Sequence, residues 1–436
     1  MQQPQQFERP LQFAGSCAEL DLLLACARWP QNETDRQLIV WLCAQQFDWA
    51  RFLLLARHHR LVSLVVRNLQ ASVAEPCAPE LADVIVELRQ LAEANAVQCL
   101  RSLAELRRIA KSLQSRGIAA RVLKGLPLAQ SVFGDFSLRS AGDIDLLIDE
   151  NERAADSTQH DAILAADRVL QGLGYRGLFA LDRFTRRQFS FYRAHWRDNA
   201  YHNPTTGFDV DLHWALFRNR AMSGSGLCNT PAGASPHVRF GDFVVETLPP
   251  SEELLYLCIH GTFDGWFCLK SLVDVAALTR SMSEAQLDSL ASLAATHGVL
   301  PELTAALILI RRYLAMDHWS TRLLPPADRT VARILRYADR ALIKGKFLAD
   351  REDVPHRVTM AFEFALRCSL RYRCELLRRI LYRARMWQTF PLPDQLFAFY
   401  PLLSPIEWVY FQLRKWRGKS TSNDSGTRLS GSSPRI

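Results

Sequence analysis

A short hydrophobic stretch that carries two alternating acids is the feature that most constrains the fold. The stretch reads Asp143-Ile144-Asp145-Leu146-Leu147-Ile148. Successive side chains of an extended strand point to opposite faces, so the two acids share one face while Ile144, Leu146 and Ile148 face a core. Two adjacent carboxylates repel each other unless a cation lies between them, and their oxygens are ligands that suit Mg²⁺. The stretch therefore predicts a strand with a metal site on one face.

The elements that precede this acid pair support a nucleotide-transfer site. A strand-like run from Ile118 to Leu123 leads into Lys124 and Gly125, followed by a helix-compatible stretch and Arg139. A glycine turn lets the backbone approach a phosphate, which a side chain would hinder. Two solvated acids on a strand are common by chance, but the order of strand, glycine turn, helix and acidic strand favours the functional interpretation.

A second alternating stretch, residues 209–214, offers a third carboxylate. Asp209, Asp211 and His213 share one face of this expected strand, and a turn at residues 203–207 predicts a hairpin with the segment Phe189–Tyr201. Asp209 and Asp211 are rival third acids. We favour Asp211 because Asp209 lies nearer the turn, where an acid is easily solvated. For His213 we favour a structural role over a catalytic one.

Together these motifs resemble the polymerase-beta-type nucleotidyltransferase superfamily. More narrowly, the chain resembles a bacterial family described only as uncharacterised nucleotidyltransferases, from about Cys17 to Tyr400. The residues that carry this narrower resemblance are Leu123-Lys124-Gly125, Arg139, Asp143 to Leu147, Asp211-Leu212-His213-Trp214, His260-Gly261, Trp266, Leu269-Lys270 and Asp274. One departure is Leu126-Pro127, which stands where the superfamily usually has a small residue after the turn glycine. The backbone and Lys124 are then the candidates for phosphate binding.

The resemblance implies an α+β fold, in which a short mixed sheet with helices forms a polymerase-beta-type nucleotidyltransferase core between N-terminal and C-terminal helical regions. It implies transfer of a nucleotidyl group from an NTP to an acceptor hydroxyl, with release of pyrophosphate and two Mg²⁺ ions. The acceptor stays open among proteins, RNA, sugars and small molecules. The implied catalytic and metal-binding residues are Asp143, Asp145 and Asp211, and the implied nucleotide-binding residues are Lys124, Gly125, Arg139 and Lys270.

Several of these residues also have structural interpretations. Lys124 can be a surface lysine at the end of a strand, and Arg139 can be a partner of Asp143. For Lys270 and Asp274, whose i, i+4 spacing is typical of a surface ion pair, we favour that structural interpretation. The functional alternative is a helix that closes over the nucleotide, with Trp266 near the base.

Hydrophobic spacing divides the chain into four parts. We expect an N-terminal helical region at residues 1–116, the catalytic core at 117–250, a C-terminal helical domain at 251–390, and an aromatic and basic segment with a disordered tail at 391–436. The apolar spacing predicts further helices over Leu254–His260, Leu269–Arg280, Glu284–His297 and Leu300–Ala315, the first of them capped around Ser251.

Composition indicates an ordinary globular protein, with 48% hydrophobic and 22% charged residues and a formal net charge of +8. Ten scattered cysteines without a Cys-x-x-Cys pair, and a polar N-terminus, predict a cytoplasmic protein without structural disulfides. Two other functions compete with the enzyme: a non-catalytic nucleotide- or ligand-binding protein, and a peripheral membrane protein. The arginines of Arg367–Arg385 and the aromatic runs Phe397–Tyr400 and Trp408–Trp416 suggest contact with an anionic membrane or nucleic acid.

Overall fold

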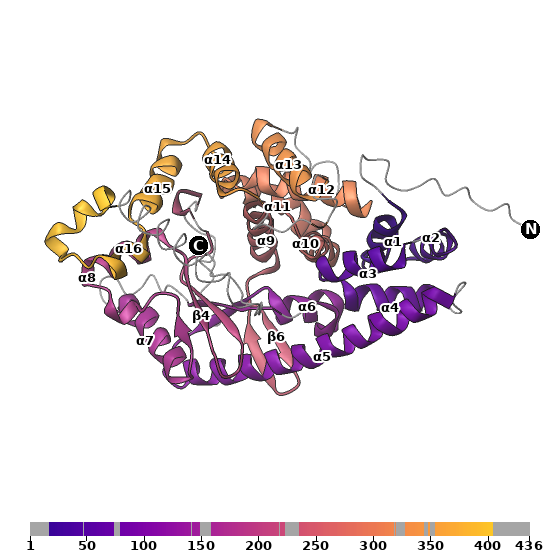
Figure 1. Cartoon of the computed structure of the whole chain (residues 1–436), viewed down its shortest axis with the longest axis horizontal. Coiled ribbons are helices and arrows are strands. Elements are labelled where there is room, and N and C mark those ends of the chain that lie inside the picture. The colour runs from indigo at the N-terminus through magenta and orange to yellow at the C-terminus, as the bar shows by residue number, and fades with distance from the viewer. Residues whose placement is uncertain are drawn as a thin grey trace, which may run out of the picture.

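The computed structural model describes residues 17–403, apart from residues 47, 74–78, 141, 149–157, 218, 223–234, 318, 320–327, 344–347 and 349–353. Within this part of the chain, helices surround one mixed sheet (Figure 1). The predicted α+β class is confirmed. The expected tail, Lys419–Ile436, and the run Trp408–Trp416 lie outside the described residues.

The N-terminal region is helical, as its apolar spacing predicted. A capping box at the second helix joins Asn32 and Asp35, whose side chains each accept the backbone N–H of the other residue. The helix that leads into the sheet is 36 residues long and buries one stripe of apolar side chains. The helices are α1 (Ala18–Cys26), α2 (Glu33–Cys43), α3 (Trp49–His58), α4 (Val62–Ser72) and α5 (Pro79–Gln114).

The sheet places the two acidic stretches next to each other. Its strands are β1 (Ala120–Leu123), β2 (Ile144–Ile148), β3 (Arg176–Gly177), β4 (Asp198–His202), β5 (Asp209–His213), β6 (His237–Phe240) and β7 (Phe243–Glu246). Their order is β3-β4-β5-β2-β1-β7-β6. β2 pairs with β1 in antiparallel and with β5 in parallel orientation, so the acidic stretches occupy central, neighbouring strands.

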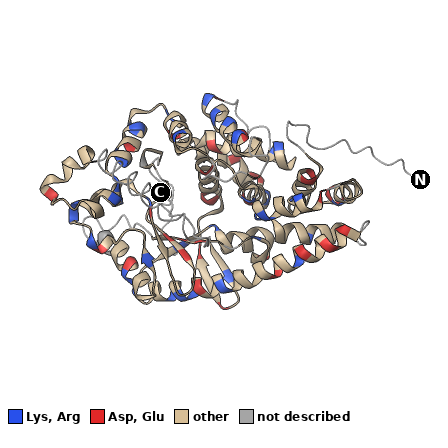
Figure 2. Ribbon diagram, viewed as in Figure 1, with Lys and Arg blue, Asp and Glu red and all other residues tan. Residues whose placement is uncertain are grey.

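The two faces of the sheet differ in chemistry. On one face Ile144, Leu146 and Ile148 join a hydrophobic cluster with α5 and α7 (Thr158–Gly172), as the alternation predicted. α5 runs beneath the sheet in Figure 1, and the helices that follow the sheet lie on its other side. Figure 2 marks acidic residues on the central strands. The opposite face of β2 and β5 is thus left for polar chemistry beneath the C-terminal helices.

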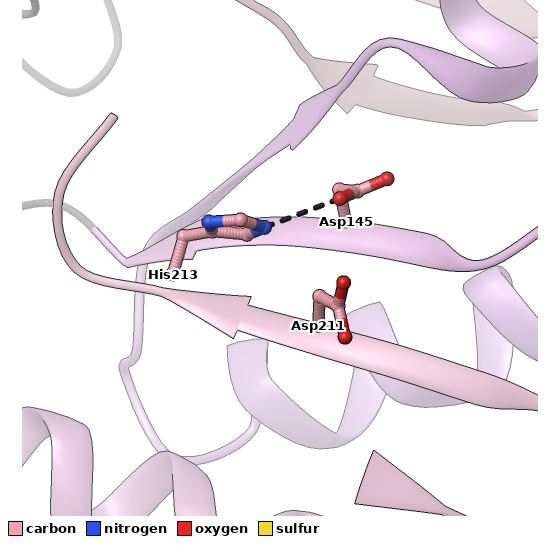
Figure 3. A group of neighbouring side chains, drawn as sticks. All are labelled: Asp145, Asp211 and His213. Carbon is pink, nitrogen blue, oxygen red and sulfur yellow. Dashed lines mark hydrogen bonds and ion pairs between the residues drawn. The ribbon is translucent and has the colours of Figure 1, made fainter. Parts of the chain in front are cut away.

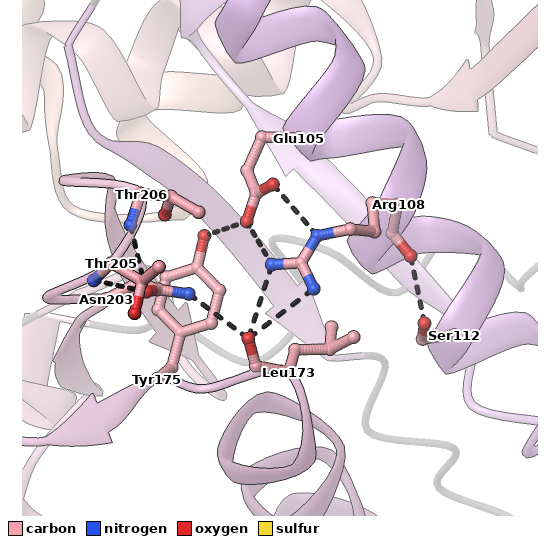
Figure 4. A network of polar contacts seen from close by, with 8 residues as sticks. All are labelled: Glu105, Arg108, Ser112, Leu173, Tyr175, Asn203, Thr205 and Thr206. Atoms are coloured by element: carbon pink, nitrogen blue, oxygen red, sulfur yellow. Dashed lines mark hydrogen bonds and ion pairs between the residues drawn. The ribbon is translucent and has the colours of Figure 1, made fainter.

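A polar network fixes the far end of the sheet to α5 (Figure 4). Glu105 on α5 accepts hydrogen bonds from Arg108 and from the hydroxyl of Tyr175. The backbone oxygen of Leu173 accepts from Arg108 and, at 3.1 Å, from the amide of Asn203 in the β4–β5 turn. These contacts hold the hairpin of β4 and β5 in register behind the acidic residues.

The first strand of this hairpin is shorter than the sequence suggested. Only residues Asp198–His202 pair with β5, whereas Phe189 lies in α8 (Arg186–His195). α8 begins with a capping box between Thr185 and Gln188, which starts a helix just before the segment that we expected to be extended, and the helix continues into that segment as far as His195.

The C-terminal helices begin with α9 (Pro250–Asp264), one residue before the expected cap at Ser251. Pro249 occupies the cap position without a side-chain hydrogen bond, so the Ser251 cap was wrong. The helices that follow α9 are α10 (Leu269–Ser281), α11 (Glu284–Thr296), α12 (Leu300–Leu314), α13 (Arg329–Leu342), α14 (His356–Leu366), α15 (Leu370–Leu381), α16 (Ala384–Thr389) and the 3-10 helix η6 (Asp394–Phe399). Earlier in the chain, α6 (Gly125–Phe133) follows β1. Helices α1 to α6 and α9 to α15 share one hydrophobic cluster, although most of the sheet separates the two groups in sequence.

The end of the described chain folds back onto the sheet domain. Phe397 and Tyr400 are buried in an aromatic cluster with Tyr192, Trp214 and Trp387. The Tyr400 hydroxyl accepts a hydrogen bond from Gln188 on α8. Two of the aromatic residues that we expected at an anionic surface therefore complete the fold instead, while Phe399 is 52% exposed.

In the part of the chain that the structure describes, no helix combines the length and apolarity needed to cross a bilayer. None of the described cysteines forms a disulfide. The cytoplasmic location and the four domain limits remain predictions.

Candidate active site

Two adjacent parallel strands bring an acid pair together on the polar face of the sheet. Asp145 on β2 is in register with Asp211 on β5. One carboxylate oxygen of each and one ring nitrogen of His213 all lie within 4.8 Å of one another (Figure 3). Because the hydrophobic residues on the opposite face fix the register, a slip of either strand by one residue would move its own acid into the core.

His213 is fully buried beside this pair. Its Nε2 lies 3.1 Å from Oδ1 of Asp145, and its Nδ1 lies 3.7 Å from Oδ2 of Asp198 at the start of β4. The ring therefore connects the central acid to the neighbouring strand. A ring nitrogen in this position can either hydrogen-bond Asp145 or serve as a ligand for metals that accept nitrogen.

The carboxylates of this group repel one another, an arrangement that suits a bound cation. Burial, together with the negative charges of Asp145 and Asp143, raises the pKa of Asp211 to about 7. A divalent ion between the carboxylates would remove this repulsion. The residues present therefore fit a hard divalent cation such as Mg²⁺.

The other two candidate acids occupy different surroundings. Asp143 lies just before β2 and is half-buried, and its charge acts on Lys124, Arg139 and Asp211. Asp209 is an exposed residue whose Oδ1 lies 2.8 Å from Nδ1 of His202. Of the two rival acids on β5, Asp211 is the one beside Asp145.

The glycine turn between β1 and α6 points its lysine at the acid pair. Lys124 and Gly125 both have positive φ, 44° and 67°, which turns the chain sharply from strand into helix. Nζ of Lys124 lies 3.0 Å from Oδ2 of Asp145. Burial would lower the pKa of Lys124, but Asp145 and Asp143 together raise it. Lys124 is thus a largely buried cation of the site, with its side chain 13% exposed, rather than a surface lysine.

Arg139 and Asp274 form a buried ion pair that the sequence did not suggest. Nε of Arg139 lies 3.0 and 3.1 Å from the two carboxylate oxygens of Asp274 on α10. From sequence Arg139 was either a phosphate ligand or a partner of Asp143, and Asp274 was expected to pair with Lys270 on the surface. Asp274 is 2% exposed, so this surface pair was wrong.

Lys270 lies at the beginning of α10, close to the same ion pair. Burial, followed by the charge of Arg139, lowers its pKa to about 8, while Asp274 acts in the opposite direction. Lys270 therefore belongs to the Arg139 side of the site. Trp266 is only 1% exposed, and its ring packs on Gly261 so closely that an added Cβ there would meet it at 2.4 Å. This packing leaves no room for Trp266 to stack on a base.

One face of α9 contributes residues that our motif analysis missed or did not place. Burial raises the pKa of the Glu253 carboxyl to about 7, and that carboxyl accepts a hydrogen bond from the backbone N–H of Lys124. Tyr256 is buried among the charges of Asp145 and Lys124. His260 follows one turn later. Their spacing of three and four residues marks one helix face, a signal present in the sequence, but nothing in it indicated that this face covers the acids.

A cation also approaches from the residue just before β4. Nε of Arg197 lies 2.9 Å from Oδ2 of Asp198, the acid beside His213. Burial would lower the pKa of Arg197, but Asp198 raises it. Two cations therefore accompany the acid group, Lys124 beside Asp145 and Arg197 beside Asp198.

A sheet with two carboxylates on adjacent central strands, a lysine-glycine turn beside them and helices over the polar face is consistent with the nucleotidyltransferase core that the motifs predicted. A family model described as uncharacterised nucleotidyltransferase matches residues 45–315, more than half of the 436-residue chain. The protein belongs to this family. A search among curated proteins found no match.

Proposed function

We propose that the protein is a Mg²⁺-dependent enzyme that transfers a nucleoside monophosphate from an NTP to an acceptor hydroxyl. The observation that carries the proposal is the placement of Asp145 and Asp211 side by side on adjacent strands. The charge of Asp143 acts on Asp211, and Nζ of Lys124 lies 3.0 Å from Oδ2 of Asp145. In this reaction the acceptor oxygen bonds to the α-phosphorus, the bond from that phosphorus to the pyrophosphate oxygen breaks, and the hydroxyl proton passes to solvent.

The residues of the chain have separate roles in this proposal. Asp143, Asp145 and Asp211 would hold two Mg²⁺ ions, which when bound neutralise phosphate charge and lower the pKa of the attacking hydroxyl. Lys124, the backbone at Gly125 and Lys270 would bind phosphate. The ion pair of Arg139 with Asp274 supports a role in holding the segment before Asp143, and the contact of His213 supports a role in orienting Asp145.

Asp211→Asn is the variant that tests the proposal most cleanly. It removes a charge that is repelled in the apo protein, so the apo melting temperature should stay equal or rise, whereas removal of Asp145 would also leave Lys124 without its partner. Transfer from α-phosphate-labelled NTPs to components of a cell extract, with Mg²⁺, should fall by at least about a hundredfold.

Asp209→Asn is the matched control, because this acid lies two residues away on the same strand but is exposed and pairs with His202. Its transfer activity should equal that of the unmodified protein. Full transfer by Asp211→Asn, or an effect of equal size in both variants, would contradict the proposed site. The labelled product also identifies the acceptor as a protein, an RNA, a sugar or a small molecule.

A second proposal concerns the outer face of α15, which is apolar. Leu370, Leu377 and Leu381 are 78%, 44% and 38% exposed, and their spacing of seven and four residues places them on one face. Exposed Arg371 and Arg378 flank them, and Figure 2 shows the basic residues of this helix. We propose that this face binds an anionic bilayer, since exposed leucines gain nothing from the polar backbone of a nucleic acid.

A further inference from the structure

We propose that the hydroxyl of Tyr256 on α9 binds the nucleotide by donating a hydrogen bond to a non-bridging oxygen of the β- or γ-phosphate. The inference rests on the proposed function and adds a substrate contact from outside the motif residues. It concerns the leaving pyrophosphate, the part of the NTP that Lys124 would also hold.

Tyr256 has a buried hydroxyl with no hydrogen-bond partner within the described residues. The residue is 1% exposed, and its oxygen is inaccessible to solvent. Buried hydroxyl groups are nearly always hydrogen-bonded, because a buried donor without a partner is unfavourable. A group of this kind beside an active site is best explained by a ligand that completes its hydrogen bonding.

The surroundings of the hydroxyl are those of the acid group. The charged groups that act on it are Asp145, Lys124, Arg197 and Asp198, all of them at the polar face of the sheet. Burial, with Asp145 next, raises the pKa of Tyr256, so the hydroxyl keeps its proton and remains a donor. A neutral donor near a lysine and a group of carboxylates that could hold a metal ion suits a phosphate oxygen, which the lysine and the metal ion would also contact.

A hydrogen bond to the backbone of Lys124 keeps the helix that carries Tyr256 next to the lysine-glycine turn. Glu253, three residues before Tyr256 and on the same face of α9, accepts a hydrogen bond from the backbone N–H of Lys124. That bond ties the first turn of α9 to the lysine-glycine turn. Tyr256 is therefore held one helical turn from the point where Lys124 enters the site.

The test is Tyr256→Phe, which removes one oxygen and keeps the ring. Binding of Mg²⁺-pyrophosphate and of Mg²⁺-ATP, measured by calorimetry, should weaken about tenfold for both probes. The apo melting temperature should stay equal or rise, because an unpaired buried donor is lost.

Tyr372→Phe is the matched control, because that hydroxyl is also buried without a hydrogen-bond partner among the described residues, but lies near Glu363 and Arg367. It should bind both probes with unchanged affinity. Unchanged pyrophosphate binding by Tyr256→Phe would overturn the inference, as would a loss for ATP alone. A marked drop in apo melting temperature would also overturn it, by showing a structural hydrogen bond. Failure of the unmodified protein to bind either probe would instead overturn the proposed function.

Discussion

His260 shows how the charges around a single side chain control its protonation. Burial lowers the pKa of this histidine to about 4, and the positive charges of Lys124 and Arg197 act in the same direction. The negative charges of Asp264, on the same helix, and of Asp145 act in the opposite direction. Nδ1 of the ring lies 3.0 Å from Oδ2 of Asp264. The imidazole is therefore neutral at physiological pH, and its side chain is 22% exposed.

This depressed pKa predicts acid sensitivity. Between the ordinary histidine pKa of 6.5 and about 4, the unfolded chain binds a proton that the folded protein does not. The stabilising contribution is complete above pH 6.5 and is lost as the pH falls through this window, by roughly 1 to 3 kcal/mol. Urea unfolding at pH 7.5 and pH 5.0 should show a smaller pH effect in His260→Gln than in the unmodified protein. Equal pH effects in both would contradict the depressed pKa.

At the scale of residues, alternation along a strand predicted more of the site than any other signal. It placed Asp145 and Asp211 on the polar face and their apolar neighbours on the other. It could not predict Tyr256, because a tyrosine on a helix is ordinarily a core residue and its charged neighbours in the site lie more than fifty residues away in sequence. Pairwise contacts at such separations have no local sequence signal.

At the scale of elements, the ion pair of Arg139 and Asp274 joins the segment before β2 to α10. The two side chains are 8% and 2% exposed, and 135 residues separate them. Burial would lower the pKa of Arg139, but Asp274 raises it. This pair shows how two motif residues that are distant in sequence meet in the fold. It also explains why Asp274 is not available for the expected surface pair with Lys270.

Breaking this pair should strongly destabilise the fold. Asp274→Asn removes the carboxylate that is in direct contact with the buried guanidinium of Arg139, and breaking a buried ion pair costs about 3 to 5 kcal/mol of unfolding free energy. Urea denaturation measures the change. The control is Asp242→Asn, which removes an ion pair with Arg107 in which the side chains are 74% and 39% exposed, and which should leave the free energy of unfolding nearly unchanged. Similar small effects in both variants would show that Arg139 finds another partner or water.

At the scale of the whole molecule, helices from both ends of the chain build one core. Leu24 of α1 and Leu309 of α12 belong to the same hydrophobic cluster. The sequence predicted both sets of helices from their apolar spacing, but periodicity gives only the buried face of each helix and not its partner. The regions that we separated by sequence are thus joined by packing, and the family match from residue 45 to 315 crosses two of the predicted limits.

The packing of the C-terminal segment on the sheet domain restricts which variants can test the proposed membrane surface. A chain that ends at Gln388 would lose Phe397 and Tyr400, both buried on the sheet domain, and its loss of binding would report unfolding. Substitutions on the outer face of α15 avoid this problem. Leu377 and Leu381 are exposed, so their replacement by Asp should leave the melting temperature within a few degrees of its original value.

The last prediction is that Leu377→Asp with Leu381→Asp abolishes retention on vesicles that contain anionic lipid, because it removes the inserted apolar surface and adds repelled charge. Arg371→Gln with Arg378→Gln should instead weaken retention at low salt and reduce its salt dependence, since each arginine adds about 1 kcal/mol near an anionic surface. Flotation across a salt series measures both effects. The control is Leu54→Asp, which alters an exposed leucine on α3. Retention of the double leucine variant at the level of this control would show that α15 does not bind the membrane. Retention of the unmodified protein on RNA but not on vesicles would show that the arginines of α15 bind a nucleic acid instead.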